Sequence, residues 1–106
     1  MLCEVWADGE TVMVYLDDGI QGEAGVSFLK PGDPFDWQVG IGIALLRLEL
    51  GIREAMWPED LAYFGLIEVD QDMLERCTFA LRGFTDGHSL ELMAMDCIEY
   101  KWIGEQ

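Results

Sequence analysis

The segment from Pro34 to Met56 constrains the fold most, because it predicts one long helix that is apolar on two sides. On a helical wheel its apolar residues fall into two stripes on nearly opposite sides. The first stripe comprises Trp37, Ile41, Ala44, Leu45, Leu48, Ile52 and Ala55, and the second comprises Val39, Ile43, Leu46 and Leu50. A surface helix has a single stripe. This helix must therefore be covered twice, either by two sheets of one monomer or by a sheet and a second subunit.

The chain also carries signals for the two ends of this helix. Asp33 suits the N-cap, Pro34 the first helical position and Asp36 the third, in the manner of a capping box. Both carboxylates would then lie at the positive end of the helix dipole. We expect the helix to run to about Met56, because Trp57 precedes a proline and is biased away from helical backbone.

Three strands are predicted before the helix. Asp8-Gly9 lies between apolar runs at 2–7 and 11–16, and Asp-Gly in this setting is the strongest short signal for a β-hairpin. Apolar and polar residues alternate in the second run, which predicts that one face of that strand is buried. A third strand is expected over about 23–29.

The chain after the helix predicts further hairpins. We expect a short helical turn over 58–65 and strands over 66–69, 75–82, 89–95 and 97–102. Asp86-Gly87 would form the hairpin turn between the second and third of these strands. The whole chain, 1–106, is thus predicted to be a single α+β domain, with antiparallel β-hairpins or a meander packed on one long central α-helix.

The net charge of the chain limits the kinds of partner that it can bind. Six Lys and Arg stand against 21 Asp and Glu, for a formal net charge of −15, yet 51% of the residues are hydrophobic. A disordered acidic tail would be poor in apolar residues, so this chain should fold and carry its charge on the surface. Such a surface repels nucleic acid and anionic membranes and attracts basic proteins. Solubility alone explains the acidity equally well.

No catalytic or metal-binding constellation is visible in the sequence. Cys3, Cys77 and Cys97 are widely spaced, and His88 is the sole histidine. These residues have none of the compact spacings of zinc sites or of Cys-His nucleophiles. Paired aspartates fit turns and caps better than a cation site. We therefore predict a cytoplasmic protein that is not an enzyme, holds no metal or cofactor, and binds neither membrane nor nucleic acid directly.

One stretch within about 12–50 carries a recognisable pattern. Its residues are Asp18-Gly19, Gly22, Gly25, Pro31-Gly32-Asp33-Pro34-Phe35-Asp36, Gly40, Ile43-Ala44 and Arg47. This pattern, G-x-A, P-x-D-x-F-D, G and I-A-x-x-R, resembles a motif in small uncharacterised proteins of bacteriophages and prophages. The chain departs from it in having Pro34 within the aspartate run and Leu48 where small residues often follow.

The resemblance implies an accessory role in a phage and brings no catalytic residues with it. Small acidic phage proteins that block host nucleases, anti-CRISPR proteins among them, match the charge of this chain by analogy. The leading hypothesis is therefore a non-enzymatic inhibitor that occupies the basic nucleic-acid channel of a host defence protein in the bacterial cytoplasm. The candidate partner-binding residues are those predicted in exposed loops, namely Asp17, Asp18, Glu23, Asp70 and Asp72.

Two other functions stay open. A small-molecule or nucleotide-binding module could be built around the Asp33/Asp36 loop and a tryptophan-lined pocket. A homodimeric structural or assembly protein could instead use the second stripe, Val39, Ile43, Leu46 and Leu50, as its seam. One broad acidic face would favour the inhibitor, and a cleft with convergent polar groups would favour the small-molecule module. An exposed apolar helix face would favour the homodimer.

Overall fold

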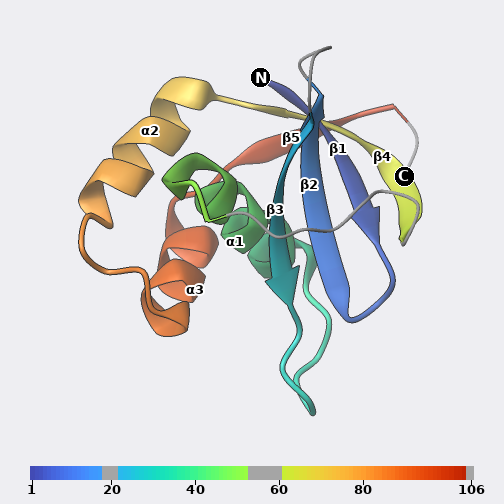
Figure 1. Cartoon of the computed structure of the whole chain (residues 1–106), viewed down its shortest axis with the longest axis horizontal. Helices are drawn as coiled ribbons and strands as arrows, with labels where there is room; N and C mark the ends of the chain where they lie inside the picture. Colours follow the sequence, from blue (N-terminus) through green and yellow to red (C-terminus); the bar gives the residue numbers. More distant parts are fainter. Residues whose placement is uncertain (18–21, 53–60, 105–106) are drawn as a thin grey trace.

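A computed structural model describes residues 1–17, 22–52 and 61–104. Its elements are β1 (Leu2–Ala7), β2 (Thr11–Asp17), β3 (Gly22–Phe28), α1 (Trp37–Leu50), β4 (Ala62–Val69), α2 (Gln71–Ala80), α3 (Gly87–Asp96) and β5 (Tyr100–Ile103). The strands form one sheet in the order β3-β2-β1-β4-β5, and every neighbouring pair is antiparallel (Figure 1). The predicted α+β class with an antiparallel sheet is confirmed.

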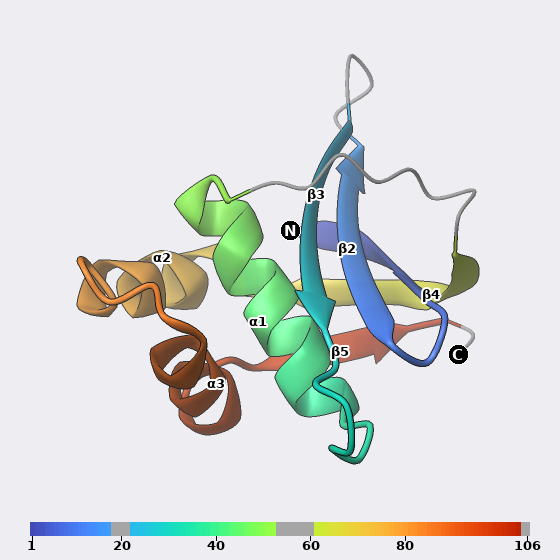
Figure 2. The ribbon, with the colours of Figure 1, turned by 60° about the horizontal axis from the view of Figure 1, so that its bottom comes forward.

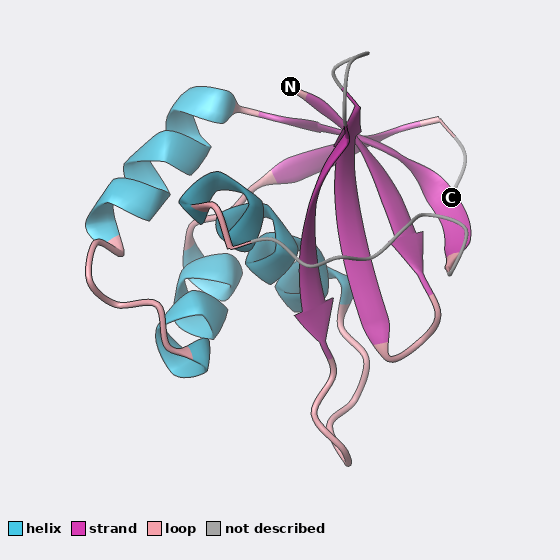
Figure 3. Cartoon of the chain, in the orientation of Figure 1, coloured by secondary structure: helices cyan, strands magenta, loops and turns pink. Residues whose placement is uncertain are grey.

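The three helices gather on one side of the sheet (Figure 3). α1 packs against β3 and β2, and α2 and α3 lie on the side of α1 away from these strands (Figure 2). Two glycines allow this close packing. A Cβ at Gly25 would collide with the backbone of Ala44, and one at Gly42 would lie 2.6 Å from the Cβ of Ala94. α1 is thus covered twice within one chain, by strands on one side and by helices on the other.

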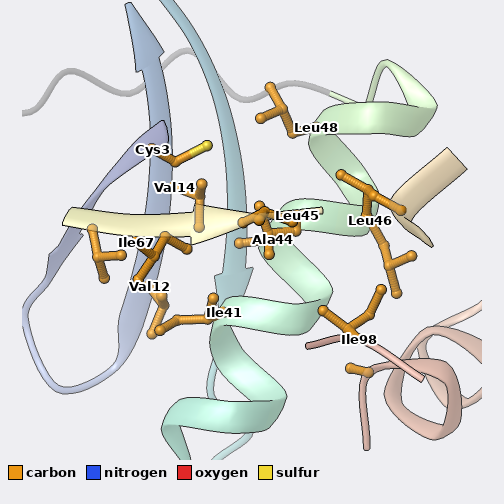
Figure 4. Packing of buried hydrophobic residues seen from close by; sticks show 14 of the residues in the cluster. Cys3, Val12, Val14, Ile41, Ala44, Leu45, Leu46, Leu48, Ile67 and Ile98 are labelled. Atoms are coloured by element: carbon orange, nitrogen blue, oxygen red, sulfur yellow. The ribbon is translucent and has the colours of Figure 1, made fainter. Parts of the chain in front are cut away.

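The main core lies between the sheet and α1 (Figure 4). Val14 and Ile67 of the sheet and Ile41 and Leu45 of α1 are fully buried there. Leu46 extends the core to the other side of the helix, where it is fully buried in the same cluster as Ile98. A smaller cluster on the opposite face of the sheet buries Met13, Ala24 and Val26. β2 therefore has buried residues on both faces, whereas its alternation predicts only one.

The predicted start of the central helix is wrong by one turn. Asp36 is the N-cap of α1, and its carboxylate accepts hydrogen bonds from the backbone N–H groups of Gln38 (2.9 Å) and Val39 (3.4 Å). The backbone N–H of Asp33 instead donates to the carbonyl of Lys30 in the preceding turn (3.1 Å). Two aspartates three residues apart carry the same capping signal, so the sequence pattern cannot choose between them.

The predicted end of that helix is also wrong, because α1 has 14 residues and stops at Leu50. Gly51 has φ +80, and its N–H donates to the carbonyls of Arg47 and Leu48. Ile52 N–H also donates to the Arg47 carbonyl (2.9 Å). A left-handed glycine closes the helix in this way, and its backbone preference outweighs the apolar pattern that continues beyond it. The predicted helical positions 53–56 lie outside the described residues.

Two predicted strands of the C-terminal half are helices. Residues 75–82 fall mostly in α2, whose N-cap is Asp70, and residues 89–95 fall in α3, whose N-cap is Asp86. The buried residues of α2 and the turn after it, Leu74, Cys77 and Leu81, have helical rather than alternating spacing. Asp86-Gly87 thus opens a helix instead of turning a hairpin, because the Asp86 carboxylate accepts the N–H of Ser89 (3.0 Å).

The remaining strand predictions are partly confirmed. The predicted strand over 66–69 is the end of β4, and β5 overlaps the one expected over 97–102. The helical turn predicted over 58–65 is wrong where the structure describes it, because 62–65 belong to β4. Its first residues, 58–60, lie outside the described part. In the described ranges, no helix has the length and apolar character that crossing a bilayer requires.

Candidate functional site

A groove runs along α1 between the edge strand β3 and α3. Its floor is formed by Val39 and Ile43 of α1, both half-buried. Phe28 stands on the β3 side and Met95 on the α3 side, and these side chains remain 54% and 56% exposed. The groove has a volume of about 360 Å³. That volume lies within the range of ligand pockets, and the exposed apolar walls leave this one open to solvent.

Two hydrogen bonds fix the distance between α1 and β3. The Ser27 hydroxyl donates to the carbonyl of Gly40 (2.8 Å), and Arg47 Nη1 donates to the carbonyl of Val26 (2.8 Å). Gly40 itself lines the groove, and a Cβ there would lie 2.9 Å from a methyl of Val12. The strand side of the groove is therefore joined to α1 by two hydrogen bonds, one of which occupies a guanidinium N–H of Arg47.

The rim of the groove is acidic. Glu10, Asp33 and Asp36 are exposed around it, and the half-buried Glu91 faces it from α3. Among the residues of the lining that the structure describes, the cations are Lys30 and Arg47. With four carboxylates against these two cations, the described lining has a formal charge of −2. Cationic groups are therefore the charged ligands that this groove would attract.

The aromatic residues near the start of α1 pack together. Trp37 makes edge-to-face contacts with Phe35, Phe64 and Trp102, at centroid distances of 4.8, 5.0 and 5.9 Å. Trp37 and Trp102 are half-buried against the main core. Asp33 and Asp36 do line the groove, as the small-molecule hypothesis expected, but none of the described residues that line it is a tryptophan.

The predicted partner-binding residues gather at the other end of the sheet. Asp17 is the last residue of β2 and pairs with Gly22, while Glu23 is half-buried beside it in β3. Asp70 and Asp72 begin α2 directly after β4. Register places the end of β2, the start of β3 and the end of β4 at the same end of the sheet. Asp18, the fifth predicted residue, lies outside the described residues.

One of these aspartates has a structural role. The Asp70 carboxylate accepts the backbone N–H groups of Asp72 (3.0 Å) and Met73 (3.3 Å) and so caps α2. Asp72 is exposed in the first turn, where its charge suits the helix dipole. Substitutions at Asp70 would therefore report on helix stability as well as on binding.

The second stripe of α1 is divided between core and groove. Leu46 is fully buried and Leu50 is half-buried against the core, while Val39 and Ile43 form the groove floor. Sequence reasoning identified this stripe but missed Glu10 and Glu91 on the rim. These two residues are far apart in the chain, and neither belongs to a motif. Only the packing of α3 beside α1 brings them to one groove.

The thiols of Cys3 and Cys77 are poorly suited to nucleophilic chemistry. Burial raises the pKa of Cys3 to about 11, although the nearby N-terminal ammonium opposes this shift. Burial, followed by the neighbouring Cys97 thiol, also raises the pKa of Cys77. A higher pKa leaves less thiolate, which is the reactive form.

The described residues include no cluster of candidate metal ligands. Within 1–17, 22–52 and 61–104, the structure contains no group of three or more His, Cys, Asp or Glu that could hold a metal ion. His88 lies exposed in the first turn of α3, next to the cap residue Asp86. In comparisons with protein-family models, curated proteins and solved structures, nothing matches this chain.

Proposed function

We propose that this chain is a non-catalytic binding protein whose partner is the basic surface of another protein. The observation that carries the proposal is the placement of the acidic side chains: none of those whose burial is described is buried. None of them belongs to the apolar core. The whole chain has 21 Asp and Glu but only six Lys and Arg to offset their charge. The negative field therefore extends around the described part of the molecule.

The partner that fits this field best normally holds nucleic acid in a basic channel. Such a channel is lined by Lys and Arg that neutralise phosphates, and clustered carboxylates compete for the same cations. The resemblance of residues 12–50 to phage proteins supports a host defence protein as the target, with inhibition as the outcome. Opposite charges would speed association, and exposed pairs would be screened beyond about 8 Å at physiological salt.

The test begins with capture of a partner on immobilised protein and its identification by mass spectrometry. Purified partner, labelled nucleic acid and a salt series then measure competition. We expect the protein and the nucleic acid to exclude each other, and their affinities to fall as salt rises. Simultaneous binding of both ligands, or an affinity that is constant in salt, would overturn the mimicry mechanism.

Charge reversals locate the surface used. A clustered variant changes Asp17, Glu23 and Asp72 to Lys, and a matched variant reverses three exposed acids on different elements, Glu49, Glu75 and Glu99. Both variants alter the net charge equally, so any difference between them reflects position. We expect the clustered variant to lose more affinity for the purified partner. Equal losses would show that net charge, and not one face, drives binding.

A further inference from the structure

We infer that the groove between β3 and α3 binds an extended, basic segment of the partner. An apolar side chain of that segment lies on Val39 and Ile43, and flanking Lys or Arg side chains point to the acidic rim. This inference rests on the proposed function and names the part of the partner that is recognised. It adds a second contact surface, at the end of the sheet opposite the one that carries Asp17 and Glu23.

The walls of the groove favour an extended chain over a compact ligand, because they come from several elements and stay open to solvent. Its lining extends from Glu10 and Lys30, beside the β1–β2 turn and the end of β3, to Met95 in the last turn of α3. Exposed apolar side chains, Phe28 and Met95, stand on both sides of it. An open groove with an apolar floor between a strand and a helix accommodates an extended backbone with one side chain directed into the floor.

The strand wall can offer main-chain hydrogen bonds as well. β3 is an edge strand of the sheet. The Val26 carbonyl points away from β2, since it accepts from Arg47, whereas Leu29 N–H points inward to the Glu10 carbonyl (2.7 Å). Backbone groups alternate direction along an antiparallel strand, so those of Phe28 point outward like those of Val26. An added extended segment could pair with this edge beside the groove.

The charge of the rim selects the chemistry of the occupant. The Asp36 carboxylate is occupied, because it caps α1. The other carboxylates of the described rim, those of Glu10, Asp33 and Glu91, cap no helix. Of Lys30 and Arg47, the cations of the described lining, Arg47 already donates to the Val26 carbonyl. An acidic segment or a nucleic acid would meet repulsion here, whereas a Lys- or Arg-bearing segment meets complementary charge.

The experiment measures fluorescence anisotropy of a labelled ten-residue peptide of alternating Lys and Val. A Glu-Val peptide of the same length is the ligand control. The groove variant carries Glu10→Lys, Asp33→Lys and Glu91→Lys. The matched variant carries Glu68→Lys, Glu75→Lys and Glu99→Lys, three exposed positions that do not line the groove and are not among the predicted partner-binding residues. Both variants change the net charge equally, and circular dichroism verifies that both fold.

We expect the Lys-Val peptide to bind the unmodified protein and the Glu-Val peptide not to bind. The groove variant should weaken binding about tenfold or more, and the matched variant should weaken it by less than about threefold. Amide NMR signals of Phe28, Val39 and Ile43 should shift on peptide addition, while those of Leu2 and Glu68 should not. This second readout uses the unmodified protein and does not depend on a variant folding.

Other results separate the two proposals. Equal weakening by both variants, with no localised NMR shifts, would overturn the groove assignment and leave the proposed function standing. Absence of binding to the Lys-Val peptide even at low salt would overturn the groove assignment, whereas the proposed function is tested separately by competition on the purified partner. A dimer in light scattering that the groove variant dissociates would assign the groove to a second copy of this chain, and so overturn the peptide proposal.

Discussion

The two ends of the second stripe of α1 differ in what covers them. At one end Leu46 is fully buried in the main core, together with Ile98. At the other end Val39 and Ile43 are half-buried and form the floor of a groove. All of these residues belong to one regular pattern in the sequence. Periodicity therefore shows that a helix face is apolar, but the packing of α3 decides where that face closes and where it stays open.

Truncating the stripe should separate its closed end from its open end. Leu46→Ala should lower the free energy of unfolding by about 2–5 kcal/mol, because it leaves a cavity in a closed core. Ile43→Ala should cost about 1 kcal/mol, since its side chain is already partly solvated and the open groove leaves no enclosed cavity. Urea denaturation of both variants measures the two costs. Equal costs would mean that the groove end is as closed as the core end.

The start of α1 offers a second contrast, between its two aspartates. Asp36→Ala should destabilise the protein by about 1 kcal/mol, because the N–H groups of Gln38 and Val39 lose their acceptor. Asp33→Ala should stay within about 0.5 kcal/mol, as its side chain caps no helix. Thermal unfolding compares the two, and Asp36→Asn is the control that keeps an acceptor. If Asp33→Ala destabilised the protein more than Asp36→Ala, Asp33 would be the N-cap, as the sequence predicted.

These aspartates also show how far the sequence alone could lead. The three N-terminal strands were predictable, because Asp8-Gly9 has the φ +94 glycine that a tight turn needs and apolar runs lie on both sides. Asp86-Gly87 repeats the same dipeptide, yet there the aspartate caps α3. The local signal is the same in both places. Packing of Leu90 and Ala94 in the core decides in favour of the helix.

The candidate site was less predictable than the fold. Asp33 and Asp36 attracted attention through their capping pattern, and Val39 and Ile43 through the stripe. Nothing local marks Glu10 or Glu91, which reach the groove only because α3 forms its second wall. Since two of the strands predicted for the C-terminal half are helices, no groove between β3 and α3 could have been anticipated. The acidity of the surface, in contrast, follows from composition alone.

Low pH should destabilise α3 by protonating its N-cap, Asp86, and this is the smallest effect expected. The Ser89 backbone N–H (3.0 Å) and hydroxyl (2.8 Å) donate to the Asp86 carboxylate, and these bonds hold the pKa of Asp86 below its usual range. Because the pKa is lower in the folded state, the stabilisation is fully present above the unfolded pKa of about 4. It is lost as the pH falls through the folded pKa.

Asp86→Asn keeps an acceptor but removes the titration, so melting temperatures of this variant and of the unmodified protein should converge between about pH 4 and pH 2. Ser89→Ala removes the hydroxyl donor and should reduce that pH dependence. A difference between Asp86→Asn and the unmodified protein that stays constant from pH 7 to about pH 2 would show that the Asp86 charge does not stabilise α3.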